Sequence, residues 1–142
     1  MPFTVRPAQP ADAVRLAEIF LQARREAFDW LNPALFRLSD FDRQTAGEEV
    51  WVAEAESGEL AGFISVWVPD SFIHHLFVAP RYQGQGVGQL LLNSLDAWLP
   101  RPYSLKCLVQ NKKALRFYRN KGWQPAETGG LGDEKYQRLV LS

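Results

Sequence analysis

The spacing of apolar residues near the start of the chain predicts a strand followed by a helix. Apolar and polar residues alternate from Phe3 to Arg6, as they do in an edge strand. Apolar residues then recur every three or four positions, which predicts an amphipathic helix from Pro10 to about Ala27. The initial proline and Asp12 in the first turn support that start, although Gln9 is a poor residue at the expected cap position.

Three apolar runs then predict three neighbouring strands. Val50–Ala55 and Leu60–Val68 are joined by the polar turn Glu56–Glu59, an arrangement typical of a hairpin. The third run, Phe72–Val78, follows Pro69 and Asp70 and is expected to pair antiparallel with the second.

The second half of the chain alternates helices with strands. Leucines on one helical face predict a helix from Gly88 to about Leu99, which two prolines end. Next come a strand over Tyr103–Val109 and a helix over Lys112–Lys121, with Asn111 as its cap and Gly122 at its end. The last predicted elements are a short strand beginning at Trp123, a glycine-rich loop over Thr128–Asp133 and a strand over Tyr136–Leu141. The order β-α-α-β-β-β-α-β-α-β-β predicts an α/β fold, a mixed sheet flanked by helices, in a single domain over residues 1–142.

The segment between the first helix and the hairpin has the weakest pattern. A turn is predicted at Trp30–Pro33, and a second short helix around Leu35–Phe41, with Ser39 or Asp40 as its cap. Four aromatic residues in this segment have two interpretations, core packing against the first helix or a wall beside a substrate. They are Phe28, Trp30, Phe36 and Phe41.

Three glycines at alternate positions mark the junction between the strand Phe72–Val78 and the following helix. The sequence is Gln83-Gly84-Gln85-Gly86-Val87-Gly88, followed by Gln89. Glycine lets backbone amides converge, and the first turn of a helix adds unpaired N–H groups and the positive end of a dipole. Together they form a seat for an anion, usually a phosphate. The plainer alternative is a glycine turn that only joins a strand to a helix.

Two phosphate-binding motifs do not fit this loop. A P-loop requires Lys-Ser/Thr after its last glycine, whereas Gly88 is followed by Gln89 and Leu90. The dinucleotide fingerprint requires a third glycine where Gln89 stands, and an acidic residue about 20 positions on, which Tyr103–Val109 lacks.

Two segments together resemble the motifs of the GNAT acetyltransferase superfamily. One resembles the pyrophosphate-binding motif of the family: Gln83-x-x-Gly86-x-Gly88 after Leu76-Phe77-Val78-x-Pro80. The other is similar to a second family motif: Asn111-x-x-Ala114-x-x-Phe117-Tyr118-x-x-x-Gly122-Trp123, with tryptophan in place of the usual phenylalanine. The resemblance covers nearly the whole chain and implies the GNAT fold, acetyl-CoA as co-substrate and no metal.

The resemblance also implies how the coenzyme is held. The loop amides would bind its diphosphate, and free backbone groups of the preceding strand would pair with its pantetheine arm. One of those amides would face the thioester carbonyl as an oxyanion donor. Asn111 would bond the pantetheine region, although helix capping alone also explains an asparagine there. The implied cofactor-binding residues are Leu76, Phe77, Val78, Gln83, Gly84, Gln85, Gly86, Val87, Gly88, Gln89, Asn111, Phe117 and Tyr118.

Tyr118 matches the family tyrosine that protonates the departing thiolate. A phenol is protonated at neutral pH and can donate its hydrogen, so the chemistry suits the residue. The other interpretation is an amphipathic tyrosine on the buried face of a helix.

The two histidines of the chain, His74 and His75, both lie on the predicted strand Phe72–Val78. Side chains alternate faces along a strand, so one histidine is predicted to face the acceptor and the other the opposite side. His74 shares its parity with Phe72 and stands where arylalkylamine acetyltransferases of the family carry a histidine. We therefore predict that His74 is the general base, with His75 as runner-up; packing roles for both are the alternative. The predicted acceptor-side residues are Trp30, Phe36, Phe72 and His75.

Composition narrows the class of protein. Apolar residues make up 46% of the chain, which favours a folded globular domain, and 16 basic residues balance 16 acidic ones. This balance provides no electrostatic footprint for nucleic acid or an anionic membrane. The single cysteine, Cys107, is expected to be a buried inert thiol and suits a reducing compartment. No secretory signal or membrane span is visible, so a cytoplasmic protein is expected.

The resemblance implies an acetyl-CoA-dependent N-acetyltransferase that acts by direct transfer in a ternary complex. The alternative is a GNAT-like module that binds acyl-CoA as a sensor or interaction partner without turnover. The acceptor, a small-molecule or peptide amine, is open, as is the choice between monomer and homodimer. An acidic group could attract a cationic acceptor, although a solvated acidic face is the default interpretation: Asp40, Asp42, Glu48 and Glu49.

Overall fold

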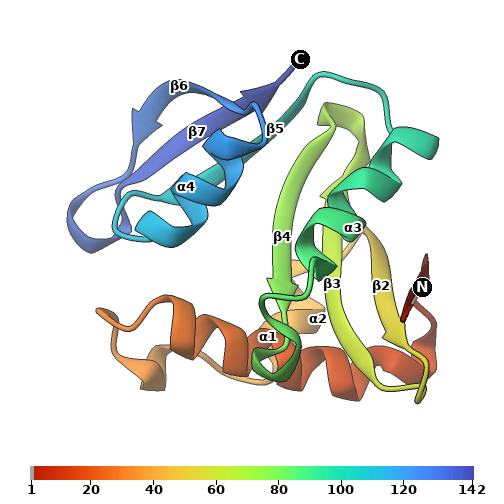
Figure 1. Cartoon of the computed structure of the whole chain (residues 1–142). Helices are drawn as coiled ribbons and strands as arrows, with labels where there is room; N and C mark the ends of the chain where they lie inside the picture. The colour runs from red at the N-terminus through yellow and green to blue at the C-terminus, as the bar shows by residue number, and fades with distance from the viewer. Residues whose placement is uncertain (1) are drawn as a thin grey trace.

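A seven-stranded mixed sheet forms the centre of the protein, with strand order β1-β2-β3-β4-β5-β7-β6 (Figure 1). The computed structural model describes residues 2–142. The strands are β1 (Phe3–Pro7), β2 (Glu49–Ala55), β3 (Leu60–Trp67), β4 (Phe72–Val78), β5 (Tyr103–Leu108), β6 (Gln124–Gly129) and β7 (Tyr136–Leu141). The helices are α1 (Ala13–Ala27), α2 (Asp40–Gln44), α3 (Val87–Ser94) and α4 (Lys112–Asn120). The predicted α/β class and element order are confirmed.

The sheet divides between β4 and β5, its one parallel pair of neighbouring strands. These two strands pair only at Phe72–Ser104 and Ile73–Leu105, and beyond those residues they no longer share a ladder. We call the region between the unpaired parts of β4 and β5 the fork. In Figure 1, β1–β4 with α1–α3 lie on one side of the fork and β5–β7 with α4 on the other.

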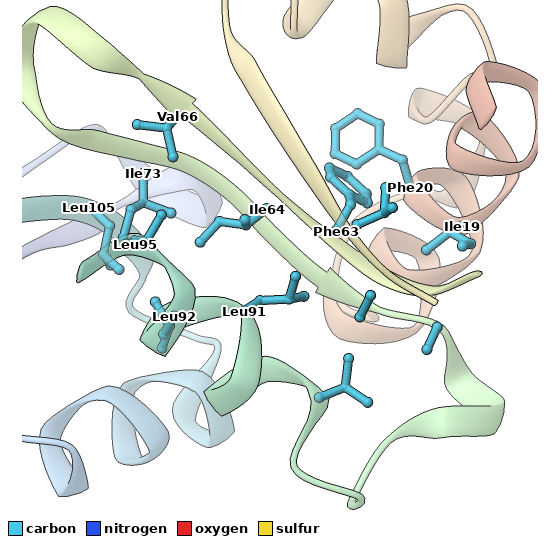
Figure 2. Packing of buried hydrophobic residues seen from close by; sticks show 14 of the residues in the cluster. Ile19, Phe20, Phe63, Ile64, Val66, Ile73, Leu91, Leu92, Leu95 and Leu105 are labelled. Atoms are coloured by element: carbon cyan, nitrogen blue, oxygen red, sulfur yellow. The ribbon is translucent and has the colours of Figure 1, made fainter. Parts of the chain in front are cut away.

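Helices cover both faces of the sheet and bury one continuous core. On one face, Ile19 and Phe20 of α1 pack near Phe63 of β3 (Figure 2). On the other face, leucines of α3 and of the turn after it pack against β3, β4 and β5 (Figure 2). The labelled residues of this second layer are Ile64, Val66, Ile73, Leu91, Leu92, Leu95 and Leu105. The alternation along β3, with Phe63 on one face and Ile64 on the other, supplies both layers.

The first helix begins three residues later than predicted. Pro10–Asp12 forms a 3₁₀ turn, and α1 starts at Ala13. The Asp12 carboxylate accepts the Gln9 amide at 2.8 Å and an Arg6 guanidinium hydrogen bond at 2.8 Å. Asp12 thus makes the reciprocal bond of a capping box to the backbone of Gln9, and its bond to Arg6 ties the helix start to β1.

The second helix is much shorter than its apolar pattern suggests. It covers Asp40–Gln44 only, while Leu35 lies in a separate 3₁₀ turn. Leu35 and Leu38 are 64% and 53% exposed, so of the apolar residues on this predicted helix only Phe41 enters the core. The prediction of one apolar helical face over Leu35–Phe41 was wrong, because Pro33 starts a separate tight turn.

Smaller differences concern element ends. The α-helix after the glycine loop ends at Ser94 and continues as a 3₁₀ turn over Leu95–Ala97. The predicted loop Thr128–Asp133 is partly strand, because β6, which pairs with β7, extends to Gly129. Asn111 caps α4 as predicted, its Oδ1 accepting the Ala114 amide at 3.3 Å.

Candidate active site

The glycine loop places free backbone amides at the start of α3. Gly84 and Gly86 have φ of +79° and +82°, the left-handed region that strains other residues. A Cβ at either position would meet no atom within 4 Å, so glycine is required by the backbone conformation, and space remains open beside it. The amides from Gly84 to Gly86 have no hydrogen-bond partner within residues 2–142, and those of the first helical turn have none by geometry. This arrangement suits an anion such as a diphosphate.

The end of β4 presents further free backbone groups to the fork. Ala79 donates its amide to the carbonyl of Ala61 at 2.8 Å. This bond shows which alternate residues of β4 direct their backbone groups toward β3 in the antiparallel ladder. By alternation Phe77 bonds toward β3, whereas Leu76 and Val78 direct their N–H and C=O groups toward the fork. The Val78 carbonyl accepts the side-chain amide of Gln83 at 3.2 Å. Leu76 and the Val78 amide are therefore the groups of β4 open to a ligand.

Tyr118 lies on α4 on the other side of the fork and is 8% exposed. Its ring packs edge-on against Trp123 and Phe117, with centroid distances of 5.5 and 5.2 Å. Burial, and then the neighbouring Cys107 thiol, raise the pKa of the phenol well above its ordinary value. Its hydroxyl has no hydrogen-bond partner in the described part of the chain. Tyr118 is thus fully protonated at neutral pH and free to donate.

Cys107 on β5 is a buried thiol, as expected. Burial raises its pKa to about 12. The thiol is therefore uncharged at neutral pH and a poor nucleophile.

The two histidines lie on the same face of the sheet, contrary to the predicted alternation. Ser65 pairs with His75 and Val66 with Ile73, so a β-bulge leaves His74 without a partner in β3. The imidazole rings stack with centroids 3.8 Å apart and planes 27° apart. The extra residue of a bulge breaks the two-residue side-chain period, which explains why strand parity predicted the wrong arrangement.

His75 is enclosed by the core under α1. Its ring lies edge-on against Phe20 at 4.6 Å, and its Nε2 is buried without a hydrogen-bond partner among residues 2–142. Burial lowers the pKa of His75 to about 3, helped by the charges of His74 and Arg24. His75 is therefore neutral at physiological pH.

His74 is bonded to Glu48, which the sequence had placed only within a group of four acidic residues and had not connected with a histidine. Its Nδ1 lies 2.7 Å from Oε2 of Glu48, just before β2. The His74 side chain is 35% exposed and that of Glu48 only 7%. Phe72 adjoins His74, with 6.0 Å between the ring centroids. Glu48 carries no motif or periodicity, so nothing in its local sequence distinguished it from Glu49.

Asp40, another of the four acidic residues, is committed elsewhere. It is buried and forms ion pairs with Arg24 at 3.1 Å and with Arg43. Backbone and side-chain hydrogen bonds, led by that from the Arg37 amide, lower its pKa to about 2. Asp40 therefore anchors the segment before β2 to α1 and does not offer a free charge to a substrate.

The aromatic residues after α1 connect the two sides of the fork. Phe28 contacts Phe77 of β4 at 6.2 Å and Trp30 at 5.7 Å, both edge-on. The Trp30 indole donates to the backbone carbonyl of Asp133, between β6 and β7, at 3.1 Å. Phe36 instead packs near the Arg24 guanidinium, 4.9 Å from its ring centroid. Of the two predicted aromatic wall residues, Trp30 bridges the fork and Phe36 supports α1.

Residues 2–142 contain neither a cluster of metal ligands nor a helix that could span a membrane. No group of three or more His, Cys, Asp or Glu side chains there could hold a metal ion. No helix in that range is long and apolar enough to cross a membrane.

Comparisons with known proteins agree with this geometry. The model of the acetyltransferase (GNAT) family matches residues 14–123. An aminoglycoside N(6')-acetyltransferase type 1 of Stenotrophomonas maltophilia is 34% identical over 106 residues, 67% of this chain and 66% of that protein, just under two thirds of it. The peptidyl-lysine N-acetyltransferase YiaC of Escherichia coli is 27% identical over 97% of this chain and 94% of its own. YncA of Salmonella typhimurium, solved with its cofactor acetyl-CoA, superimposes with a TM-score of 0.70 over 99% of this chain and 94% of that one, at 20% identity.

Proposed function

The chain belongs to the acetyltransferase (GNAT) family of acetyl-CoA-dependent N-acetyltransferases, and from that premise we propose that it transfers an acetyl group to an amine at the fork between β4 and β5. The observation that carries this proposal is the end of the β4–β5 ladder after Ile73 and Leu105. It leaves backbone donors and acceptors of β4 unpaired directly before the loop of free amides. A long ligand with an anionic end fits both features.

The chain's own residues fit the two ends of acetyl-CoA. The loop amides from Gly84 to Gln89 would hold its diphosphate, and Leu76 and Val78 would bond its pantetheine arm as an added strand. The Val87 and Gln89 positions contribute through their amides, and Gln83 through its brace on β4. Bound there, acetyl-CoA supplies the activated acetyl group. Asn111, which caps α4, and Phe117 on α4 would line the other side of the proposed path.

Three groups of the protein would then serve direct transfer. His74 accepts the proton that the acceptor amine loses as its nitrogen bonds the carbonyl carbon. The Leu76 or Val78 amide donates to the carbonyl oxygen as negative charge develops. Tyr118 donates its hydroxyl proton to the sulfur as the carbon–sulfur bond breaks. His75, neutral and buried, would support the His74 ring rather than exchange protons itself.

The acceptor is a primary amine in this proposal, entering on the side of Phe72 and His74. Trp30 would border the acceptor path, because its hydrogen bond to the β6–β7 segment joins the two sides of the fork. The relatives named above act on an aminoglycoside and on peptidyl lysine, which supports an amine and leaves its scaffold open. A cytoplasmic location and a monomeric or homodimeric state also stay predictions.

The test measures coenzyme affinity and turnover separately. Calorimetry with coenzyme A should give a binding isotherm, and an amine panel should release free thiol from acetyl-CoA. Tyr118→Phe is expected to lower kcat by about 10²-fold or more while coenzyme affinity stays within a factor of two. Tyr82→Phe is the matched control, since its ring packs on Phe3 in the core.

Each alternative has its own outcome in this experiment. Coenzyme binding without thiol release across the panel would support the sensor alternative. Full turnover in Tyr118→Phe would remove the phenol from the mechanism, and no binding heat at all would refute the cofactor site.

A further inference from the structure

The carboxylate of Glu48 is an unusual group to find buried. Its side chain is 7% exposed, Oε2 lies 2.7 Å from His74, and Oε1 is buried with no hydrogen-bond partner among residues 2–142. A buried charge with an unpaired oxygen costs free energy, so such a group indicates a purpose other than stability. The Glu48 amide, bonded to the Thr45 carbonyl at 3.0 Å, fixes the backbone that presents it.

The hydrogen bond between Glu48 and His74 determines where His74 carries its proton. A carboxylate accepts hydrogen bonds, so this contact favours the His74 tautomer that carries its proton on Nδ1. The neutral ring then carries its lone pair on Nε2, the nitrogen not held by Glu48. Because His74 is 35% exposed and Glu48 is not, a substrate amine meets the imidazole rather than the carboxylate.

The bulge in β4 completes the support of this ring. His75 covers one face of His74 at 3.8 Å, and Phe72 lies beside it. His75 stays neutral and so adds no competing proton exchange. The His74 ring is thus held at Nδ1 by the Glu48 carboxylate and on one face by the stacked His75 ring.

We propose that Glu48 is a positioning residue that makes His74 the general base of the acetyl transfer. Glu48 keeps the proton on Nδ1, aims Nε2 at the acceptor amine, and stabilises the imidazolium formed when Nε2 takes the amine proton. The imidazolium later returns that proton to water. This role rests on the proposed function, because Glu48 acts through His74 as the base of acetyl transfer. It gives Glu48 no part in binding acetyl-CoA.

Neighbouring carboxylates do not compete for the role. Glu49 is exposed on β2, and Asp40 is paired with two arginines. The charged group beside Phe72 is a cation, the Lys106 ammonium, 5.9 Å from the ring centroid. Within the described residues, Glu48 is the carboxylate that forms an ion pair with a histidine.

The first test reads the proton directly. Long-range ¹⁵N–¹H spectra of the neutral His74 ring in the full-length protein are expected to show the Nδ1–H form in the wild type. That form should be lost in Glu48→Gln, in which the amide can donate as well as accept, and retained in Glu56→Gln. Glu56 lies exposed in the hairpin turn at the far end of β2, so it is the matched carboxylate-to-amide control.

The second test is a double-mutant cycle on kcat. Glu48→Gln should lower kcat by roughly 10- to 100-fold, less than His74→Ala, because it removes the support and not the base. In the His74→Ala background the same change should have no further effect, since Glu48 acts only through His74. Coenzyme A affinity should stay unchanged in all three variants.

The outcomes separate this inference from the proposed function. An Nδ1–H form that survives in Glu48→Gln, or losses that multiply in the double variant, would overturn the role of Glu48 and leave His74 as base. Full activity in His74→Ala would overturn the base itself, and the spectra would still show whether the ion pair holds the ring.

Discussion

Acid should destabilise this protein through His75 before it affects any carboxylate. The imidazole is enclosed beside Phe20, its Nε2 has no hydrogen-bond partner among the described residues, and burial lowers its pKa from 6.5 to about 3. Between pH 6.5 and pH 3 the unfolded chain therefore binds a proton on His75 that the folded protein does not bind. Stability is fully present above the unfolded pKa and is lost as the pH falls through it.

The size of this effect follows from the two pKa values. Between pH 7 and pH 5 the unfolded histidine goes from mostly neutral to almost fully protonated, while the folded one stays neutral. The difference in bound protons, integrated over that range, lowers the free energy of unfolding by about 2 kcal/mol. For a chain of this size that corresponds to a fall in Tm of roughly 6 °C.

The perturbation is His75→Phe, which keeps an aromatic ring against Phe20 and removes the titrating nitrogens. Urea denaturation of both proteins at pH 7 and pH 5 measures the difference. The wild type should lose about 2 kcal/mol more than the variant over this range. At pH 7 the variant should be no less stable, since an unpaired buried nitrogen has been removed.

Carboxylates do not confuse this comparison. Asp40, with its pKa lowered to about 2, costs stability only where its unfolded form takes up protons, well below pH 5. Equal losses for wild type and His75→Phe between pH 7 and pH 5 would show that His75 is solvated or protonated in the folded protein, and the reasoning from its burial would fail.

Three further predictions follow from other contacts. Gly86→Ala and Gly58→Ala put the same strain at a positive φ with open space beside it, so both should lower the free energy of unfolding by about 1–2 kcal/mol. Only Gly86→Ala should weaken coenzyme A binding in calorimetry, and equal affinities would exclude the loop as the anion seat. Trp30→Phe removes the hydrogen bond to the β6–β7 segment and should raise the acceptor KM by about 2- to 10-fold without changing coenzyme affinity; an unchanged KM would assign Trp30 to packing. Asp40→Ala leaves Arg24 buried without its partner and should cost about 3–5 kcal/mol in urea denaturation, and a loss below 1 kcal/mol would contradict its anchoring role.

The parts of the site that local sequence determines were predictable. The strand, the glycine loop and the start of α3 depend on residues within a few positions of one another, and Gly84 and Gly86 adopt the positive φ that their side chains permit. The cap at Asn111 is equally local. The comparisons support the family assignment that the two motifs suggested.

The parts that depend on partner strands were not predictable. The bulge opposite Ser65 exists only in the register of β3 against β4, so the common face of His74 and His75 has no signal in their own segment. The ion pair with Glu48 joins residues 26 positions apart, and the Trp30 contact joins residues 103 apart. Such pairs arise from the arrangement of elements and not from any one segment's pattern.

The cofactor side of the fork is built almost wholly from main-chain atoms: the loop amides and the open edge of β4. A main-chain group is present whatever residue occupies the position, provided that the backbone keeps its path. Mutation can therefore replace most side chains around that path without removing the main-chain groups that would bind the coenzyme. The acceptor side that we propose depends instead on side chains such as Glu48, His74 and Trp30, so new substrate preferences can evolve there while the donor half is inherited intact.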